Sequence, residues 1–307
     1  MNNDLLKKAK IFGYILGDGW IDKNGGCGAS GDEKSLYNLI KDIEDLWGEN
    51  SCGKVRTRQT FSPKYNIRGT SSQFTIHANV AKELLFLGMP QGKRTEQSYN
   101  IPEWILQGDC GIKTNFISGY YAAEGLIPSL QTNRKTPRPL SFCFSKNILF
   151  KNSAFILSQQ FQKILNDIGF NVSITHFNEI TKTEMIKYTI TINNSEQDFV
   201  KALNLLRLDY CLDKEIRRKQ LLTYFSLKEA ERQKIISLKE AVIKERQLNK
   251  TTYAKLMTMF NLTKSQIENI FNGKQKCKVL KNFPKFDQNF INTYCSIKTP
   301  LNDENLI

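Results

Sequence analysis

Hydrophobic residues along the chain follow two periods, and these predict helices and strands in a recurring order. Residues 34–47 carry apolar side chains at the three- and four-residue spacing of a helix with one buried face. Residues 72–77 alternate instead, with Phe74 and Ile76 opposite three polar residues, which is typical of a strand. The same succession recurs after residue 116, so each half is predicted to read α-β-β-α-β-β-α.

The pattern changes beyond Asp213. Residues 215–247 are charged and helical without a strand signal, which favours a solvated connecting helix. Residues 251–275 have the apolar positions of a helix-turn-helix unit, with Asn261 at the turn and a capping box predicted at 263–266. A plain helical hairpin that packs on the core is the alternative. The patterns predict an α+β fold in four parts: a first repeat (1–115), a second repeat (116–213), a helical connector (214–250), and a small all-α, helix-turn-helix-like domain with a tail (251–307).

Two short segments, 12–19 and 117–125, are nearly alike. Superposed, they match Gly13 with Gly119, Tyr14 with Tyr120, Gly17 with Ala123 and Asp18 with Glu124. Small residues four positions apart on a helix allow two helix backbones to approach closely. The repetition therefore predicts a molecule with internal pseudo-twofold symmetry and two paired acids at its centre.

The two acids are predicted to lie at the C-terminal ends of adjacent helices. The helix dipole is negative there, and a carboxylate is disfavoured by about 0.3–1 kcal/mol. Two like charges close together add to that cost, so a divalent cation is the natural compensation. Oxygen ligands with open positions suit Mg²⁺ or Mn²⁺ rather than zinc. The simpler interpretation is a pair of buried helices that end in solvated acids.

The charge of the chain indicates a polyanionic partner. The net charge is +14, and residues 201–307 hold 21 Lys and Arg against 11 Asp and Glu. Basic proteins of this kind bind phosphate backbones, although charge does not distinguish DNA from RNA, and a merely soluble basic protein is the alternative. A magnesium-bearing acid pair beside basic strands fits phosphodiester hydrolysis. No Ser/His/Asp or Cys/His arrangement and no phosphate-binding G-x-x-x-x-G-K-[ST] loop is present in the sequence.

Cysteine usage and hydropathy predict the compartment. Seven scattered cysteines without a C-x-x-C pair suit a reducing cytosol, and two distant histidines argue against a zinc site. No apolar run approaches the roughly 20 residues of a membrane span, and the first residues lack a signal peptide's hydrophobic core. We expect no membrane association and no secretion, and a location in the cytoplasm near the nucleoid or in an organellar matrix.

The paired segments resemble the LAGLIDADG motifs of homing endonucleases in the single-chain, two-repeat form. The resemblance covers residues 9–210, and 81–93 followed by 101–104 resembles the family's passage into its second repeat. It implies a monomer whose two sheets form a DNA-binding saddle. It also implies metal-dependent, site-specific cleavage of double-stranded DNA at a long, non-palindromic site, with the C-terminal helix-turn-helix lengthening the footprint.

The resemblance also implies roles for individual residues. Asp18 and Glu124 would be the metal-binding carboxylates, assisted by the main-chain oxygens of Gly17 and Ala123. Lys34 and Lys146, at matching places before each half's long helix, would stabilise charge or position water as catalytic residues. The second motif departs from the family pattern, with Glu for Asp and Ala for Gly, and we interpret this as asymmetry between the halves.

DNA contacts are expected from strand faces that point away from the helices and from the start of the last predicted helix. Arg and Lys read guanine in the major groove, but many such contacts reach only phosphate. The candidates are Lys54, Arg56, Arg58, Arg68, Gln73 and Thr75 in the first half, Arg134, Lys135, Arg138, Lys187 and Thr189 in the second, and Lys264, Ser265 and Gln266 beyond them.

Two other functions fit the same scaffold. A non-catalytic transcription regulator would use the repeats and the helix-turn-helix for binding alone, although such a protein has no need of paired acids near phosphates. An RNA maturase would keep the acids and bind RNA, and basic charge does not exclude it. Nothing in the sequence indicates a self-splicing intein, whereas a gene inside an intron, and hence intron homing, is compatible with it.

Overall fold

A computed structural model describes residues 3–62, 67–128, 137–179, 184–192, 195–272 and 283–295. The chain divides into two compact units. The first contains Met1–Ser129 and Arg138–Lys219, and thus most of both predicted repeats, while the second contains Leu130–Pro137 and Gln220–Pro300. Within the described ranges, no helix is both long and apolar enough to cross a membrane.

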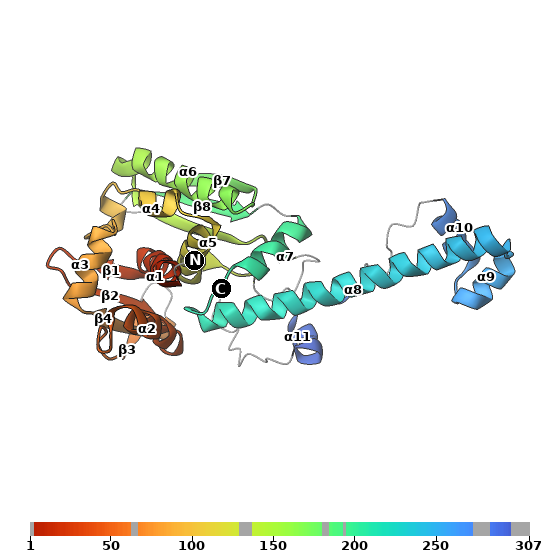
Figure 1. Ribbon diagram of the computed structural model, residues 1–307, viewed down its shortest axis with the longest axis horizontal. Helices are drawn as coiled ribbons and strands as arrows, with labels where there is room; N and C mark the ends of the chain where they lie inside the picture. The colour runs from red at the N-terminus through yellow and green to blue at the C-terminus, as the bar shows by residue number, and fades with distance from the viewer. Residues whose placement is uncertain are drawn as a thin grey trace. The chain divides into compact units, whose positions relative to one another are not determined.

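The first half of the first unit is a four-stranded antiparallel sheet with helices on one face (Figure 1). Its strands are ordered β1-β2-β4-β3, and α1 and α2 pack against it. The elements are α1 (Asn3–Asp18), β1 (Gly19–Ile21), β2 (Cys27–Gly31), α2 (Glu33–Trp47), β3 (Arg56–Ser62), β4 (Ile67–Ile76) and α3 (Ala78–Phe86). The helix predicted over 34–47 is confirmed, and it ends at Gly48, whose φ of 93° is easy only for glycine.

The second half repeats this arrangement after a short connection. The connection holds the one-turn helix η1 (Arg94–Glu96) and α4 (Glu103–Leu106). The elements that follow are α5 (Cys110–Glu124), β5 (Gly125–Leu126), β6 (Ser141–Asn147), η2 (Ile148–Phe150), α6 (Lys151–Asp167), β7 (Val172–Glu179), β8 (Met185–Ile192) and α7 (Glu196–Leu205). The sheet order is β5-β6-β8-β7, with α5 and α6 packed on it. The fold is thus α+β with two four-stranded sheets, while the saddle shape and its symmetry stay predictions.

Alternation along the strands builds the core of each sheet. Phe74 and Ile76 of β4 are buried, as predicted, while Thr75 between them is exposed. In β8, Ile186, Tyr188, Ile190 and Ile192 are buried and the residues between them are not. Each sheet therefore buries one face under its helices and leaves the other face at least partly accessible.

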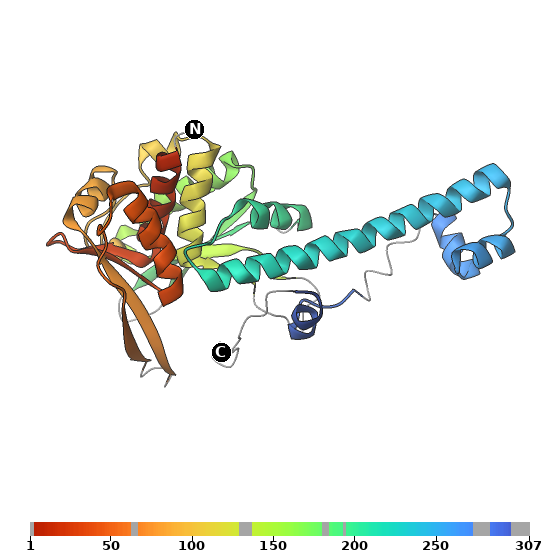
Figure 2. The ribbon, with the colours of Figure 1, turned by 60° about the horizontal axis from the view of Figure 1, so that its bottom comes forward.

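Helices α1 and α5 pack side by side at the centre of this unit (Figure 2). A Cβ atom built on Gly13 would overlap the main-chain oxygen of Phe116, and one built on Gly119 would overlap that of Lys10. Only glycine permits so close an approach of two backbones. The predicted role of the small residues is confirmed at both positions.

Helix α8 (Leu212–Asn249) begins in the first unit and continues into the second. In the second unit, α9 (Tyr253–Phe260) and α10 (Lys264–Phe271) pack against α8 around Val242, Leu256, Ile267 and Ile270. Asn261 between them has the predicted left-handed conformation (φ 50°, ψ 47°), and the predicted capping box of Thr263 and Gln266 is present. A further helix, α11 (Gln288–Tyr294), packs the ring of Phe290 5.1 Å from that of Tyr224.

Candidate functional site

Two carboxylates end the two central helices. Asp18 is the last residue of α1 and Glu124 the last of α5. A Cβ atom on Gly17 would lie 3.2 Å from Cγ of Glu124 and would overlap Cβ of Ala123, so the two helix ends touch. Burial raises the pKa of both carboxyl groups, and the charge of Asp18 raises that of Glu124 further. The sequence-predicted acid pair is thus brought together in a partly desolvated place.

A cation caps the C-terminus of each central helix. The guanidinium of Arg94 donates to the main-chain oxygens of Ile15 (2.8 Å), Gly17 (2.7 Å) and Gly19 (2.8 Å), and also to that of Leu16. The oxygens of Ile15, Leu16 and Gly17 belong to the last turn of α1, where a helix leaves its carbonyls without a helical partner, whereas Gly19 begins β1.

Lys214 in the first turn of α8 does the same for α5. Its ammonium donates to the main-chain oxygens of Ala122 (2.8 Å) and Ala123 (2.6 Å). Both Lys214 and Arg94 lower the pKa of Asp18 and Glu124, although burial prevails and the shift of each carboxyl is upward. Burial also lowers the pKa of Lys214 itself. The site therefore consists of two acids and two cations at two helix ends.

Sequence reasoning missed both cations. Arg94 lies between the predicted elements, and Lys214 lies at the edge of the predicted helical connector. A basic residue at either place is normally interpreted as a solvated charge. A positional signal exists, because Arg94 follows α3 and Lys214 follows α7 by fewer than ten residues each, so the two occupy corresponding places after the third helix of each half. The same contacts engage the oxygens of Gly17 and Ala123, which were predicted to assist a metal. A carbonyl oxygen has a second lone pair, so each is left with one acceptor position.

The donor set at the helix ends fits a hard divalent cation. Among the described residues, no group of three or more His, Cys, Asp and Glu side chains gathers in a metal-binding arrangement. Two carboxylates with repelling charges are present at this place, and both would be relieved by a positive ion. Mg²⁺ and Mn²⁺ accept one or two protein carboxylates and fill their other positions with water and substrate phosphate. Asp18 and Glu124 are suited to hold such an ion.

Lys34 shares a cleft with Asp18, and its predicted catalytic role stays a prediction. The two residues line a cleft of about 660 Å³, and the Lys34 side chain is exposed. Hydroxyl groups make up much of the remaining wall, from Ser30, Tyr37, Thr57, Thr70, Ser71 and Ser72. Asp32 and Glu33 also line the cleft, so it holds three carboxylates and one lysine beside these hydroxyl groups.

Lys146 has different surroundings, although it was predicted to match Lys34. Its side chain is 1% exposed. The ammonium donates to the main-chain oxygens of Arg94 (3.0 Å) and Gln97 (2.6 Å) and lies 3.8 Å from the centre of the Tyr99 ring. Burial, together with the charge of Arg94, lowers its pKa to about 8. The predicted equivalence of the two lysines is therefore not found.

The predicted strand contacts fall on accessible positions where the structure describes them. Arg56 and Gln73 are register partners on β3 and β4, so their side chains leave the same face of the sheet. Arg58 and Thr75 are exposed on the same strands, Lys54 is exposed just before β3, and Arg138 is exposed before β6. Lys187 and Thr189 lie on the half-exposed face of β8. The side chain of Arg68, and all of Arg134 and Lys135, lie outside the described residues.

The three contacts predicted at the start of α10 are not equivalent. Lys264 and Ser265 are exposed. Oε1 of Gln266 accepts from the backbone N–H of Thr263 at 2.7 Å as part of the capping box. A bidentate contact to adenine needs both amide atoms, so Gln266 is not free to make one without giving up its cap.

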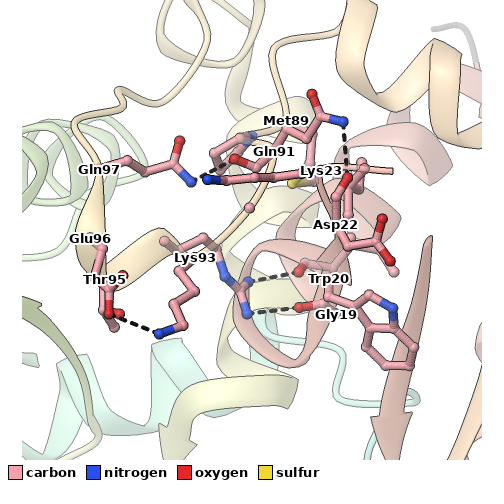
Figure 3. A pocket seen from close by; sticks show the side chains of 15 residues that line it. Gly19, Trp20, Asp22, Lys23, Met89, Gln91, Lys93, Thr95, Glu96 and Gln97 are labelled. Atoms are coloured by element: carbon pink, nitrogen blue, oxygen red, sulfur yellow. Dashed lines mark hydrogen bonds and ion pairs between the residues drawn. The ribbon is translucent and has the colours of Figure 1, made fainter. Parts of the chain in front are cut away.

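A larger cavity, of about 920 Å³, lies between the β1–β2 turn and the connection that carries Arg94 (Figure 3). Gln91 donates to the main-chain oxygen of Asp22, and Gln97 donates to that of Gln91, so the two walls are tied together. Neither Asp18 nor Glu124 lines this cavity. The cavity borders the segment that carries Arg94 and does not include the acid pair.

No family model matches the chain. The chain is 26% identical to the tRNA-splicing ligase RtcB of Pyrococcus furiosus, over 91% of the chain and 29% of that protein. It is 24% identical to the replication factor C small subunit of Methanocaldococcus jannaschii, over 91% of the chain and 15% of that protein. It is also 27% identical to the DNA-directed RNA polymerase subunit Rpo1N of the same organism, over 54% of the chain and 13% of the subunit. The chain thus spans less than a third of the curated relatives it matches.

These names contradict the resemblance to LAGLIDADG homing endonucleases. Five of the seven matching relatives are named tRNA-splicing ligase, and none of the seven is named as an endonuclease. The identification, the cleavage of double-stranded DNA and the intron homing that rested on it are corrected accordingly. The regulator and maturase alternatives gain no support. The physical reason is that close-packed helices ending in acids specify where charge gathers, and leave the identity of the nucleic acid undetermined.

Proposed function

We propose that this chain is a nucleic-acid-binding module that carries divalent-metal-dependent phosphodiester chemistry, with RNA as its substrate. One observation carries the proposal: Asp18 and Glu124 meet at the ends of two close-packed helices, each capped by a cation. Two repelling, half-buried acids lower the stability of the fold, so their placement indicates a function rather than a structural role.

The site residues have complementary tasks in such chemistry. Asp18 and Glu124 would hold Mg²⁺ or Mn²⁺, which when bound polarises a phosphate oxygen and lowers the pKa of bound water. Arg94 and Lys214 fix the two helix ends and add positive charge near the phosphate. An attacking water or hydroxyl oxygen would form the new bond to phosphorus, and the leaving oxygen would depart and take up a proton. Lys34, exposed in the cleft that Asp18 also lines, would contact the strand.

The relatives' names support the choice of RNA and also limit it. Most of these relatives are named tRNA-splicing ligase, which favours an RNA substrate. Nearly the whole chain also aligns with a replication factor C subunit, and in each relative it covers a minority of the length. We therefore propose that the module has a chemistry of its own and does not by itself perform the activity for which any one relative is named.

A substrate panel tests this proposal. The full chain is incubated with end-labelled single-stranded RNA, stem-loop RNA, paired tRNA halves and duplex DNA of equal length, with Mg²⁺, Mn²⁺ or EDTA. Denaturing gels then show any strand that is shortened or joined. We expect metal-dependent change in RNA that is lost in Asp18→Asn and Glu124→Gln, while the exposed acid variant Glu103→Gln retains it.

The other outcomes are equally decisive. Tight binding of every substrate without metal-dependent change would contradict the enzymatic proposal. Reaction with duplex DNA and none with RNA would contradict the choice of substrate. Reaction that survives in both Asp18→Asn and Glu124→Gln would place the chemistry elsewhere in the chain.

A further inference from the structure

We infer that Lys146 is a positioning residue, which holds the segment that carries Arg94 and thereby keeps the Arg94 guanidinium on the end of α1 beside Asp18. The inference rests on the proposed function, because it concerns the geometry of the same site. It assigns to Lys146 a task different from the catalytic one that its place in the sequence predicts.

The ammonium group of Lys146 is buried away from any carboxylate of the described residues. Lys146 lies on β6 with 1% of its side chain exposed. In the described part of the chain its ammonium contacts main-chain oxygens and an aromatic ring, and no carboxylate. Burial of an ammonium group without a carboxylate is costly, and an aliphatic side chain would fill such a core more favourably. The reason for a lysine at this buried position therefore lies in the groups to which its ammonium donates.

The ammonium group of Lys146 donates to the two ends of η1. The two acceptors, the oxygens of Arg94 and Gln97, lie at the start of the one-turn helix η1 and just after its end. A helix of one turn has almost no internal hydrogen bonds, and its preceding residue, Lys93, supplies no side-chain cap. Contacts from β6 therefore stabilise η1 from outside, and the Tyr99 ring closes over the same ammonium at 3.8 Å.

Helix η1 carries the guanidinium that caps α1. The side chain of Arg94, the first residue of η1, bonds the oxygens of Ile15, Gly17 and Gly19. A shift of η1 by about 1 Å would break several of these hydrogen bonds together, because each depends on a narrow range of distance and angle. The contacts run from β6 through Lys146 and η1 to the end of α1. The second half of the unit therefore fixes the cation that caps the central helix of the first half.

Lys34 provides the contrast. The sequence predicted that it would match Lys146, but Lys34 lies in the first turn of α2, is exposed and lines the cleft of Asp18, whereas Lys146 lies on β6. The two halves thus use corresponding lysines differently: one faces the cleft and the other supports a neighbouring segment. Lys34→Met is accordingly a matched control for removal of a lysine.

The experiment measures the mobility of the Arg94 guanidinium by NMR on the full chain with isotope-labelled arginine, with the Arg94 signal assigned by Arg94→Lys. In Lys146→Met, we expect rotation about the Arg94 Cζ–Nε bond to become about ten-fold faster. Arg218, buried with Glu215 at 2.6 Å in the same unit, is the internal reference and should not change. Lys34→Met should leave both signals as in the unchanged chain.

Unchanged Arg94 mobility in Lys146→Met would overturn the inference. Should that variant not fold, which loss of the Arg218 signal would reveal, Lys146→Gln is judged by the same criterion, since it keeps a donor one bond shorter.

The activity measurement separates this inference from the proposed function. If RNA is processed, Lys146→Met should lower kcat by about ten- to a hundred-fold with KM nearly unchanged, and Lys146→Arg should restore part of the loss. A rise in KM with unchanged kcat would contradict the positioning role. If the unsubstituted chain processes no substrate, the proposed function fails, while the Arg94 mobility still decides whether Lys146 positions that side chain.

Discussion

The ammonium group of Lys146 donates a 3.0 Å hydrogen bond to the main-chain oxygen of Arg94, and the Arg94 guanidinium donates to the oxygen of Gly17 at 2.7 Å. Two cations, Lys146 and Arg94, thus connect the second sheet to the end of the first central helix. Like charges close together are unfavourable, and the attraction of Arg94 to Asp18 and Glu124 offsets part of that cost.

The buried lysine should make stability depend on pH. Its pKa is about 8 in the folded chain against 10.5 ordinarily, so between these values the unfolded chain binds a proton that the folded chain has released. The contribution of Lys146 to the free energy of unfolding therefore rises with pH over this window, by an amount on the order of 1–3 kcal/mol. Urea unfolding at pH 7.5 and 10 should show a smaller rise in Lys146→Met than in the unsubstituted chain. An identical rise in both would contradict the assignment.

The close approach of α1 and α5 should not tolerate a methyl group. Gly13→Ala is expected to lower the free energy of unfolding by about 2–3 kcal/mol, because the added Cβ would overlap the main-chain oxygen of Phe116. Gly69→Ala is the control, since its Cβ would meet only the Thr60 hydroxyl at 3.4 Å. Urea unfolding of both variants provides the measurement, and equal effects would refute the packing argument.

Neutralising one acid of the pair should stabilise the chain when divalent ions are absent. Asp18→Asn removes the repulsion of Glu124 in a half-buried place, and we expect a gain of about 1 kcal/mol at pH 7 in EDTA. Asp45→Asn is the matched control, because it loses the 2.6 Å contact with Lys7 and should lower stability slightly or not at all. A loss of stability in Asp18→Asn would show that the acid has a structural role.

Removal of a cationic cap should affect the helix end that it serves. Lys214→Met leaves the oxygens of Ala122 and Ala123 without this donor, and we expect a loss of about 1–3 kcal/mol. Hydrogen exchange should rise in the last turn of α5 and stay unchanged in the last turn of α1, whereas Arg94→Met should give the reverse. Exchange that rises equally in both helices would contradict separate caps.

The turn between α9 and α10 should prefer glycine to alanine. Asn261 has φ 50°, where a Cβ is strained and where asparagine is better tolerated than other residues with side chains. Asn261→Ala should therefore lower stability by about 1 kcal/mol, while Asn261→Gly should be neutral or slightly stabilising. Hydrogen exchange in α9 and α10 of the full chain measures both effects, and equal behaviour of the two variants would refute the strain argument.

Local patterns were sufficient for the elements of the fold. The period of 3.6 in 34–47, the alternation around Phe74 and the turn at Asn261 each predicted an element that the structure contains. These features depend on neighbours within a few residues, so the sequence holds the necessary information. The function inferred from the doubled motif was contradicted, because a short motif reports helix packing and charge and does not report the substrate.

The sequence by itself determined the paired acids, the glycines between the central helices and the basic character of the chain. Only the tertiary structure decided that Arg94 and Lys214 cap those helices and that Lys146 is buried while Lys34 is exposed. These contacts join residues 49 to 92 positions apart, from Gln97 with Lys146 to Ala122 with Lys214. The physical reason is that a cation's role depends on the oxygens around it, and for these residues the packing of distant segments supplies those oxygens.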